Sequence, residues 1–367
     1  MNGTLIEKRV SQRNYGIDLL RLVSSFYVII LHTINQGGVY SATVSHTYQN
    51  YVCKLLLIFS ICAVNIFGII SGYVGYRDTE KNASFSGFFP LWLSVVFYNV
   101  LICAVYMFLL PDTVTGIHLL HMFFPLSKNL YWYFSAYTLV YFLSPHLNKI
   151  LQNTSEKDLR KFFYLVCFVI VPLEYLGKCF NMGNGYSPIW LLFLYLIGAI
   201  LKKCQIGKNI PAFALIGGIL ITNLGFYILN EKFFDAVFFI FDLDFKIDSS
   251  YITPFFLAPA IFHVILFSRF QFHKPFQKII AFCSPAIFFV YIVNVHPHFW
   301  YYYMYKHFVD WSTSSPAGIV ARTILFSFVF VSAVIIIDFF RQKLFHILGV
   351  QNWPQIISSL FQKYKTV

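Results

Sequence analysis

Long apolar runs dominate this 367-residue sequence and restrict its fold more than any other feature. Most of them extend over 17 to 25 residues, enough for a helix rising ~1.5 Å per residue to cross ~30 Å of hydrocarbon. Only 11% of the residues are charged, which is too few to give a chain of this length a water-facing surface. We therefore expect an all-α polytopic membrane protein embedded in a lipid bilayer.

About ten membrane-spanning helices are expected, each bounded by polar residues or by glycine and proline. No repeat and no linker rich in proline or serine divides the sequence, so we expect residues 1–367 to form a single integral-membrane domain. The expected spans are 15–35, 52–76, 87–110, 129–148, 162–178, 187–202, 210–230, 251–269, 279–304 and 316–340.

The 27 lysines and arginines are distributed unevenly between the two sets of loops. With ten spans, 19 of them fall at the termini or in loops on the same side as the termini, and five fall in loops on the other side. Because positively charged loops stay in the cytoplasm, both termini are expected to be cytoplasmic. The same bias accounts for the net charge of +12, so no nucleic-acid partner is expected.

No metal site is expected from the cysteines and histidines. The seven cysteines lie mostly inside apolar runs and include no CxxC pair, which favours apolar packing over zinc binding or disulfide formation. His296 and His298 are two residues apart and would not converge on one metal ion along a continuous helix. Pro297 between them favours a bend.

The first span contains three ionisable residues, and each would cost ~2.5–3.5 kcal/mol at the centre of a membrane helix. Asp18 and Arg21 are one turn apart and can pair. His32 follows Arg21 by eleven residues, which returns to within ~20° of the same face, ~16 Å further along the axis. We expect Asp18, Arg21, Ser25 and His32 to form one polar stripe facing protein or a water-filled cavity. Alternatively, Arg21 snorkels to the cytoplasmic interface and His32 lies at the outer interface without a function.

The residue types in this stripe suit particular chemistry. A neutral imidazole has a pKa of ~6.5, so His32 near the outer surface is suited to removing a proton from a hydroxyl group at neutral pH. An arginine partway across the membrane is suited to binding an anion.

Two further segments combine polar and unusual residues. Ser71 lies beside Gly72 and Gly75 at the end of the second span, where small residues admit either close helix packing or a ligand. The expected outer loop 231–250 mixes aromatic with acidic residues, which suits either sugar contacts or an amphipathic segment lying on the membrane.

Aromatic and polar residues also mark the expected outer ends of two other spans. Tyr131 and Trp132 precede Tyr133 at the start of the fourth span, where an interfacial aromatic belt is the alternative to substrate contact. Asn294 and His296 lie at the outer end of the ninth span.

Five segments along the sequence carry a resemblance to a known family. In order, they are GIDLLRLVSSFYVIILH, ISGYVGY with LWLSVVFYN, YWYFSAYTLVYFLSPHLNK, YLIGAILKK and SPAIFFVYIVNVHP. Over nearly its whole length the chain resembles the acyltransferase-3 family of bacterial membrane acyltransferases, especially the branch found with Gram-positive surface-polysaccharide synthesis. The resemblance implies a ten-helix enzyme of the bacterial cell membrane. It implies transfer of an acyl group, usually acetyl, from cytoplasmic acetyl-CoA to a sugar hydroxyl of a surface polysaccharide or its lipid-linked precursor.

The resemblance also implies roles for residues. An arginine and a histidine separated by ten residues on the first helix are functional in that family, and they match Arg21 and His32. We expect His32 to act as general base with His296 as a second catalytic histidine, and Arg21 to hold the anionic or carbonyl group of the donor. Arg77 and Lys81 are expected to bind the phosphates of coenzyme A. The residues expected to bind substrate or support the site are Asp18, Ser71, Tyr131, Trp132 and Asn294.

Two features depart from the family pattern. The segment NASFSGFFPLW before the third span lacks the basic residues that many members have there, so donor binding would fall to Arg77 and Lys81. Asn294 stands where members of this branch often have histidine, which removes a proton carrier and leaves His32 and His296.

Two other functions fit a polytopic chain with polar groups in the membrane: a transporter or flippase for a polysaccharide precursor, and a polysaccharide polymerase. Transporters tend to show internal repeats and paired interrupted helices, and neither is recognisable in this sequence. A polymerase would usually need a larger outer loop than 231–250.

Overall fold

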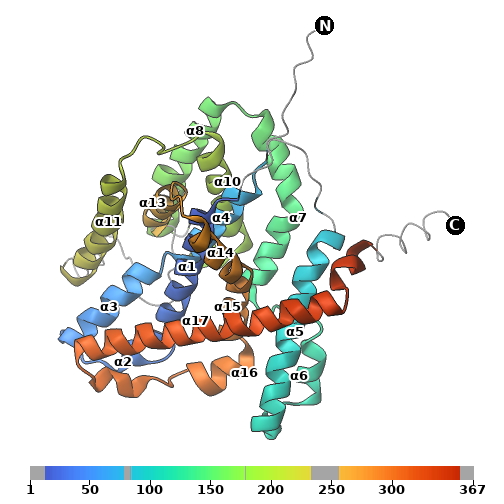
Figure 1. Cartoon of the computed structure of the whole chain (residues 1–367). Coiled ribbons are helices and arrows are strands. Elements are labelled where there is room, and N and C mark those ends of the chain that lie inside the picture. The colour runs from blue at the N-terminus through green and yellow to red at the C-terminus, as the bar shows by residue number, and fades with distance from the viewer. Residues whose placement is uncertain (1–12, 78–82, 84, 178, 233–255, 356–367) are drawn as a thin grey trace, which may run out of the picture.

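The computed structural model describes residues 13–77, 83, 85–177, 179–232 and 256–355, and these form a bundle of helices (Figure 1). No β-strand occurs in these ranges, which confirms the all-α prediction. Lys81 and most of the expected outer loop 231–250 lie outside the described residues.

Helices occur at all ten positions where spans were expected. The longer helices are α1 (Tyr15–Ile34), α3 (Tyr48–Ser60), α4 (Ala63–Gly75), α5 (Phe85–Leu109), α7 (Trp132–Asn153), α8 (Glu156–Leu165), α9 (Val171–Gly177), α10 (Pro188–Lys203), α11 (Ala212–Lys232), α13 (Leu257–Phe267), α14 (Lys274–Cys283), α15 (Ile287–Asn294) and α17 (Pro316–Ile347). Three shorter helices are α2 (Val39–Ala42), α6 (Gly116–His121) and α16 (Pro297–Phe299).

Within the described ranges, five segments are long and apolar enough to cross a membrane. They are Tyr15–Ala42, Tyr48–Gly75, Phe85–Leu109, Lys274–Asn294 and Pro316–Ile347. The chain is therefore a helical membrane protein, and the count of ten crossings stays a prediction.

Helix α17 has an exposed apolar face that suits contact with lipid. It runs across the other helices from the side of α3 to the side of α5 (Figure 1). Its outward face carries Leu325, Phe328 and Phe340, which are 63%, 59% and 62% exposed. Such a contiguous apolar face would be unfavourable in water and is stable against lipid chains.

The ninth expected span is not one helix. Pro285 lies in the short 3-10 turn Ser284–Ala286 between α14 and α15, and Pro297 begins α16 after α15 ends at Asn294. A proline inside a helix removes one hydrogen bond and clashes with the preceding turn, which explains both interruptions. The bend expected at Pro297 is confirmed, and the side chains on either side of it point to different neighbours.

Helices α4 and α10 pack together at the centre of the bundle (Figure 1). A Cβ atom added to Gly72 would lie 1.8 Å from the carbonyl oxygen of Tyr195, and one added to Gly198 would lie 1.9 Å from that of Ile69. The two backbones therefore approach so closely that only glycine fits. For Gly72, close helix packing is the correct alternative.

Replacing Gly72 by alanine is expected to lower the melting temperature of the purified protein in detergent, because the new methyl group would push α4 away from α10. Overpacking of this kind costs about 1–3 kcal/mol or more. Gly217→Ala in α11 is the matched control, because no atom lies within 4 Å of its added Cβ. Equal melting temperatures for the two variants would contradict the packing argument.

Candidate functional site

The polar residues of α1 begin with a buried carboxylate held between two arginines. Asp18 is 5% exposed. It accepts hydrogen bonds from the Arg13 Nε atom at 2.5 Å and from an Arg21 terminal nitrogen at 2.9 Å. The expected Asp18–Arg21 pair is confirmed. One carboxylate between two guanidinium groups leaves this end of the helix with a net positive charge.

Arg21 lines a cavity of about 260 Å³, which we call the inner cavity because α1 begins on the side of the expected cytoplasmic N-terminus. Arg77, at the end of α4, lines the same cavity and is exposed. Ser71 and Gly75 of α4 complete this wall, and the Ser71 hydroxyl donates to the Phe67 carbonyl at 2.8 Å. Two arginines therefore line one cavity, and guanidinium groups are well suited to binding an anionic ligand.

The opposite wall of the inner cavity comes from residues that the sequence analysis did not select. The Asn148 amide donates to the Gly75 carbonyl at 3.0 Å, and its oxygen accepts from the Tyr195 hydroxyl at 2.9 Å. Tyr137 and Ser144 of α7 also line the cavity. Their placement follows from the packing of α10 on α4 and of α7 on α10, which hydropathy does not reveal.

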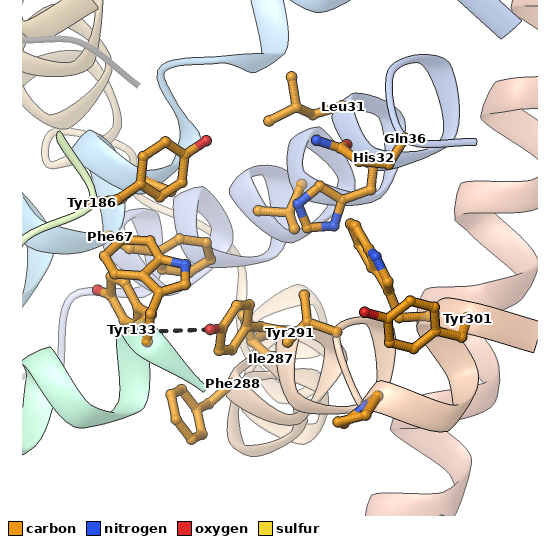
Figure 2. Close-up of a pocket in the computed structure, with 16 residues that line it drawn as sticks. Leu31, His32, Gln36, Phe67, Tyr133, Tyr186, Ile287, Phe288, Tyr291 and Tyr301 are labelled. Carbon is orange, nitrogen blue, oxygen red and sulfur yellow. Dashed lines mark hydrogen bonds between the residues drawn. The ribbon is translucent and has the colours of Figure 1, made fainter. Parts of the chain in front are cut away.

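A second, larger cavity of about 610 Å³ lies beside the other end of α1, and we call it the outer cavity (Figure 2). His32 and Gln36 of α1 lie on its wall, and the His32 ring points away from its helix toward the aromatic side chains (Figure 2). The aromatic residues that line it are Phe67, Trp132, Tyr133, Tyr186, Phe288, Tyr291, Trp300 and Tyr301. Aromatic rings with a hydroxyl or an indole N–H offer a flat apolar face together with a polar edge.

The imidazole ring of His32 is held by one hydrogen bond and one aromatic contact. Its Nδ1 atom is hydrogen-bonded to the side-chain oxygen of Asn294, the last residue of α15. Its ring also meets Trp300 edge to face, with the centroids 5.2 Å apart and the planes at 88°. The imidazole is therefore held from two directions at the cavity wall.

Helices α1, α4 and α7 each contribute residues to both cavities, with the outer cavity at one level of these helices and the inner cavity at the next. Arg21 and His32 belong to α1, and Ser71 lies one turn after Phe67 on α4. On α7, Tyr133 lines the outer cavity and Tyr137, one turn later, lines the inner cavity. The Tyr133 amide donates to the Tyr291 hydroxyl at 3.3 Å (Figure 2).

The aromatic residues at the start of α7 are not an interfacial belt, because they face protein. Trp132 lines the outer cavity, and its contact with substrate stays a prediction. Tyr131 is only 1% exposed and does not line either cavity. Its hydroxyl donates to the Asn99 side chain, which in turn donates to the Met122 carbonyl at 3.1 Å. Tyr131 therefore supports the site from behind.

His296 lines neither cavity, although its neighbours Val295 and Pro297 line the outer one. It is 3% exposed, and its Nε2 atom lies 4.0 Å from the Cys103 sulfur of α5. Since α15 ends before His296, the continuous-helix argument against convergence with His298 fails: ligand atoms of Cys103, His296 and His298 lie within 4.8 Å of one another. The structure therefore does not bring His296 and His32 together at one cavity.

The hydrogen bonds of His296 and His298 favour a cluster of one thiol and two neutral imidazoles over a metal site. The Nδ1 atom of His296 accepts from the His298 backbone N–H at 3.3 Å, so in the neutral ring its Nε2 atom carries the proton that faces Cys103. A metal ion would need that nitrogen unprotonated. The His298 Nε2 atom donates to the Thr113 carbonyl at 3.2 Å.

Comparison with known proteins gives one match. The sequence profile of the acyltransferase-3 family, described as an acyltransferase domain, matches residues 14–341, which include both cavities. No curated protein and no solved structure matches the chain. Since the matched region covers nearly the whole sequence, the chain belongs to the acyltransferase-3 family and is a membrane acyltransferase.

Proposed function

We propose that this acyltransferase moves an acetyl or other short acyl group from acyl-CoA to a hydroxyl of a surface polysaccharide or its lipid-linked precursor, in the cell membrane of a bacterium. The observation that carries the proposal is that one helix, α1, places Arg21 in the inner cavity and His32 in the outer cavity. Donor and acceptor then bind at opposite ends of one row of residues.

The inner cavity suits coenzyme A as the donor carrier. Arg21 and Arg77 offer guanidinium groups to phosphates, for which their planar geometry is well matched. Lys81, outside the described residues, follows Arg77 by four positions and adds a further positive charge nearby in sequence. The flexible pantetheine arm of the donor would extend from these cations toward Ser71 and Tyr133.

The outer cavity suits a saccharide hydroxyl as the acceptor. The aromatic rings would pack against the apolar faces of a sugar, and Gln36 would bond to its hydroxyl groups. In the transfer step, His32 Nε2 takes the hydroxyl proton while the hydroxyl oxygen attacks the thioester carbonyl. The carbon–sulfur bond breaks, and coenzyme A leaves as a thiol after receiving the proton from the imidazolium.

A comparison of cells with and without the protein separates this function from its rivals. The glycan would be isolated, and its O-acetyl content and chain length would be measured by proton NMR. Loss of the acetyl signal at constant chain length is the expected result. Loss of the glycan altogether would instead favour a transporter or a polymerase.

Replacing Arg77 by alanine is expected to raise the KM for acyl-CoA by about 5- to 30-fold with little change in kcat, because a hydrogen bond to a charged group contributes about 1–2 kcal/mol at an exposed site. Steady-state assays of acyl transfer at varied acyl-CoA would measure this. Lys161→Ala is the control, since Lys161 is an exposed cation that lines neither cavity. An equal effect of both variants would indicate general electrostatics instead of a donor site.

A further inference from the structure

Asn294 and His32 are 262 positions apart in the sequence and meet only because α15 ends beside α1. Asn294 is completely buried and does not line the outer cavity, so it is not placed to touch the acceptor. Its side-chain oxygen faces the Nδ1 atom of His32.

This contact determines where the imidazole proton resides. An amide oxygen can only accept a hydrogen bond, so the Nδ1 atom of a neutral His32 must be the donor. Nε2 is then unprotonated, and no described residue offers it a hydrogen bond. An unprotonated Nε2 is the state that a general base needs.

The Asn294 side-chain nitrogen shows that packing alone does not account for an asparagine at this position. Its Nδ2 atom is buried and has no hydrogen-bond partner within the described ranges. An unsatisfied buried donor is destabilising, whereas an apolar side chain of similar shape would avoid that cost. Asparagine is therefore not the residue that stability alone would favour at position 294.

We propose that Asn294 is a positioning residue that fixes His32 in the Nδ1–H tautomer and so directs an unprotonated Nε2 atom toward the outer cavity. This inference rests on the proposed role of His32 as the base. It assigns Asn294 a task different from that of a proton carrier, because the amide keeps its own protons throughout the reaction.

The test combines two variants with a spectroscopic readout. Asn294→Leu keeps the approximate volume but removes the acceptor, and we expect kcat to fall by about 10- to 100-fold. The KM for acyl-CoA should not rise, because the proposed donor site is in the inner cavity. The melting temperature should not fall, because the substitution removes an unpaired buried amide. Asn294→Asp restores an acceptor at the same place and should recover kcat to within about 10-fold of the original.

The spectroscopic arm needs no substrate. Nitrogen-15 NMR of protein labelled at histidine, with His32→Gln used to assign the signal, should show Nδ1 protonated and Nε2 bare in His32. An Nε2–H tautomer, an undiminished kcat in Asn294→Leu, or an Asn294→Asp variant as slow as Asn294→Leu would each overturn the proposal. Failure of the proposed function is separately visible, because the unmodified protein would then transfer no acyl group while the tautomer could still be read.

Discussion

Replacing His32 by alanine is expected to lower acyl transfer by about 10²- to 10⁴-fold, the usual contribution of a general base. The described wall of the outer cavity contains no other histidine and no carboxylate, so no other side chain there is suited to take over proton removal. The loss should appear in kcat, because donor binding depends on the arginines of the inner cavity.

The measurement is transfer of labelled acetyl groups by purified protein, with the amount of folded protein checked by size-exclusion chromatography. His346→Ala is the matched control, since His346 lies exposed near the end of α17 and lines neither cavity. Transfer at the original rate by His32→Ala would refute the assignment of the base.

Replacing Asp338 by alanine is expected to destabilise the protein by about 3–5 kcal/mol, because it would leave the buried Arg341 guanidinium without its counter-charge. Asp338 is completely buried. It accepts hydrogen bonds from Arg341 Nε at 2.6 Å, from the Gln342 amide at 2.7 Å and from the Tyr98 hydroxyl at 3.0 Å. The carboxylate thus connects α17 with α5.

Arg341 is similarly enclosed. Its terminal nitrogen donates to the Ser94 hydroxyl at 2.9 Å, and its guanidinium carbon lies 4.9 Å from the centre of the Phe289 ring. Because a buried charge is costly only when unpaired, Asp338→Leu combined with Arg341→Met should recover most of the stability that Asp338→Ala loses.

Melting temperatures in detergent would compare these variants with Lys161→Ala, which breaks an exposed ion pair to Asp158 and should change stability little. If Asp338→Ala has the same melting temperature as the unmodified protein, the buried Arg341 does not depend on this carboxylate, and the argument is wrong.

The sequence predicts local geometry along a single helix well. Asp18 and Arg21 pair as their three-residue spacing requires, and Arg21 and His32 both line cavities because eleven residues return to one face of a helix. Gly72 lies at a close helix contact, as small residues in membrane helices often do. These features depend only on helical periodicity and residue size.

Contacts between distant segments could not be predicted in the same way. Hydropathy gives the approximate depth of Asn294 in the membrane but not its partner, and the contact with His32 depends on the packing of α15 against α1. The bend after α15 brings His296 to Cys103, where a continuous ninth span would not. Asp338 did carry a signal, since it is an acidic residue in an apolar run three positions before Arg341, which the span boundary at 340 assigned to a cytoplasmic tail.

The sidedness of transfer tests the central claim most directly. The protein would be reconstituted into vesicles in one orientation, verified by protease access to a tag on the N-terminus. Labelled acetyl-CoA would be supplied only on the side of the N-terminus and acceptor saccharide only on the other. We predict that label accumulates on the saccharide, and that His32→Ala and Arg21→Ala both prevent it. Labelling only when donor and acceptor share one side would contradict an enzyme that binds its two substrates at opposite ends of α1.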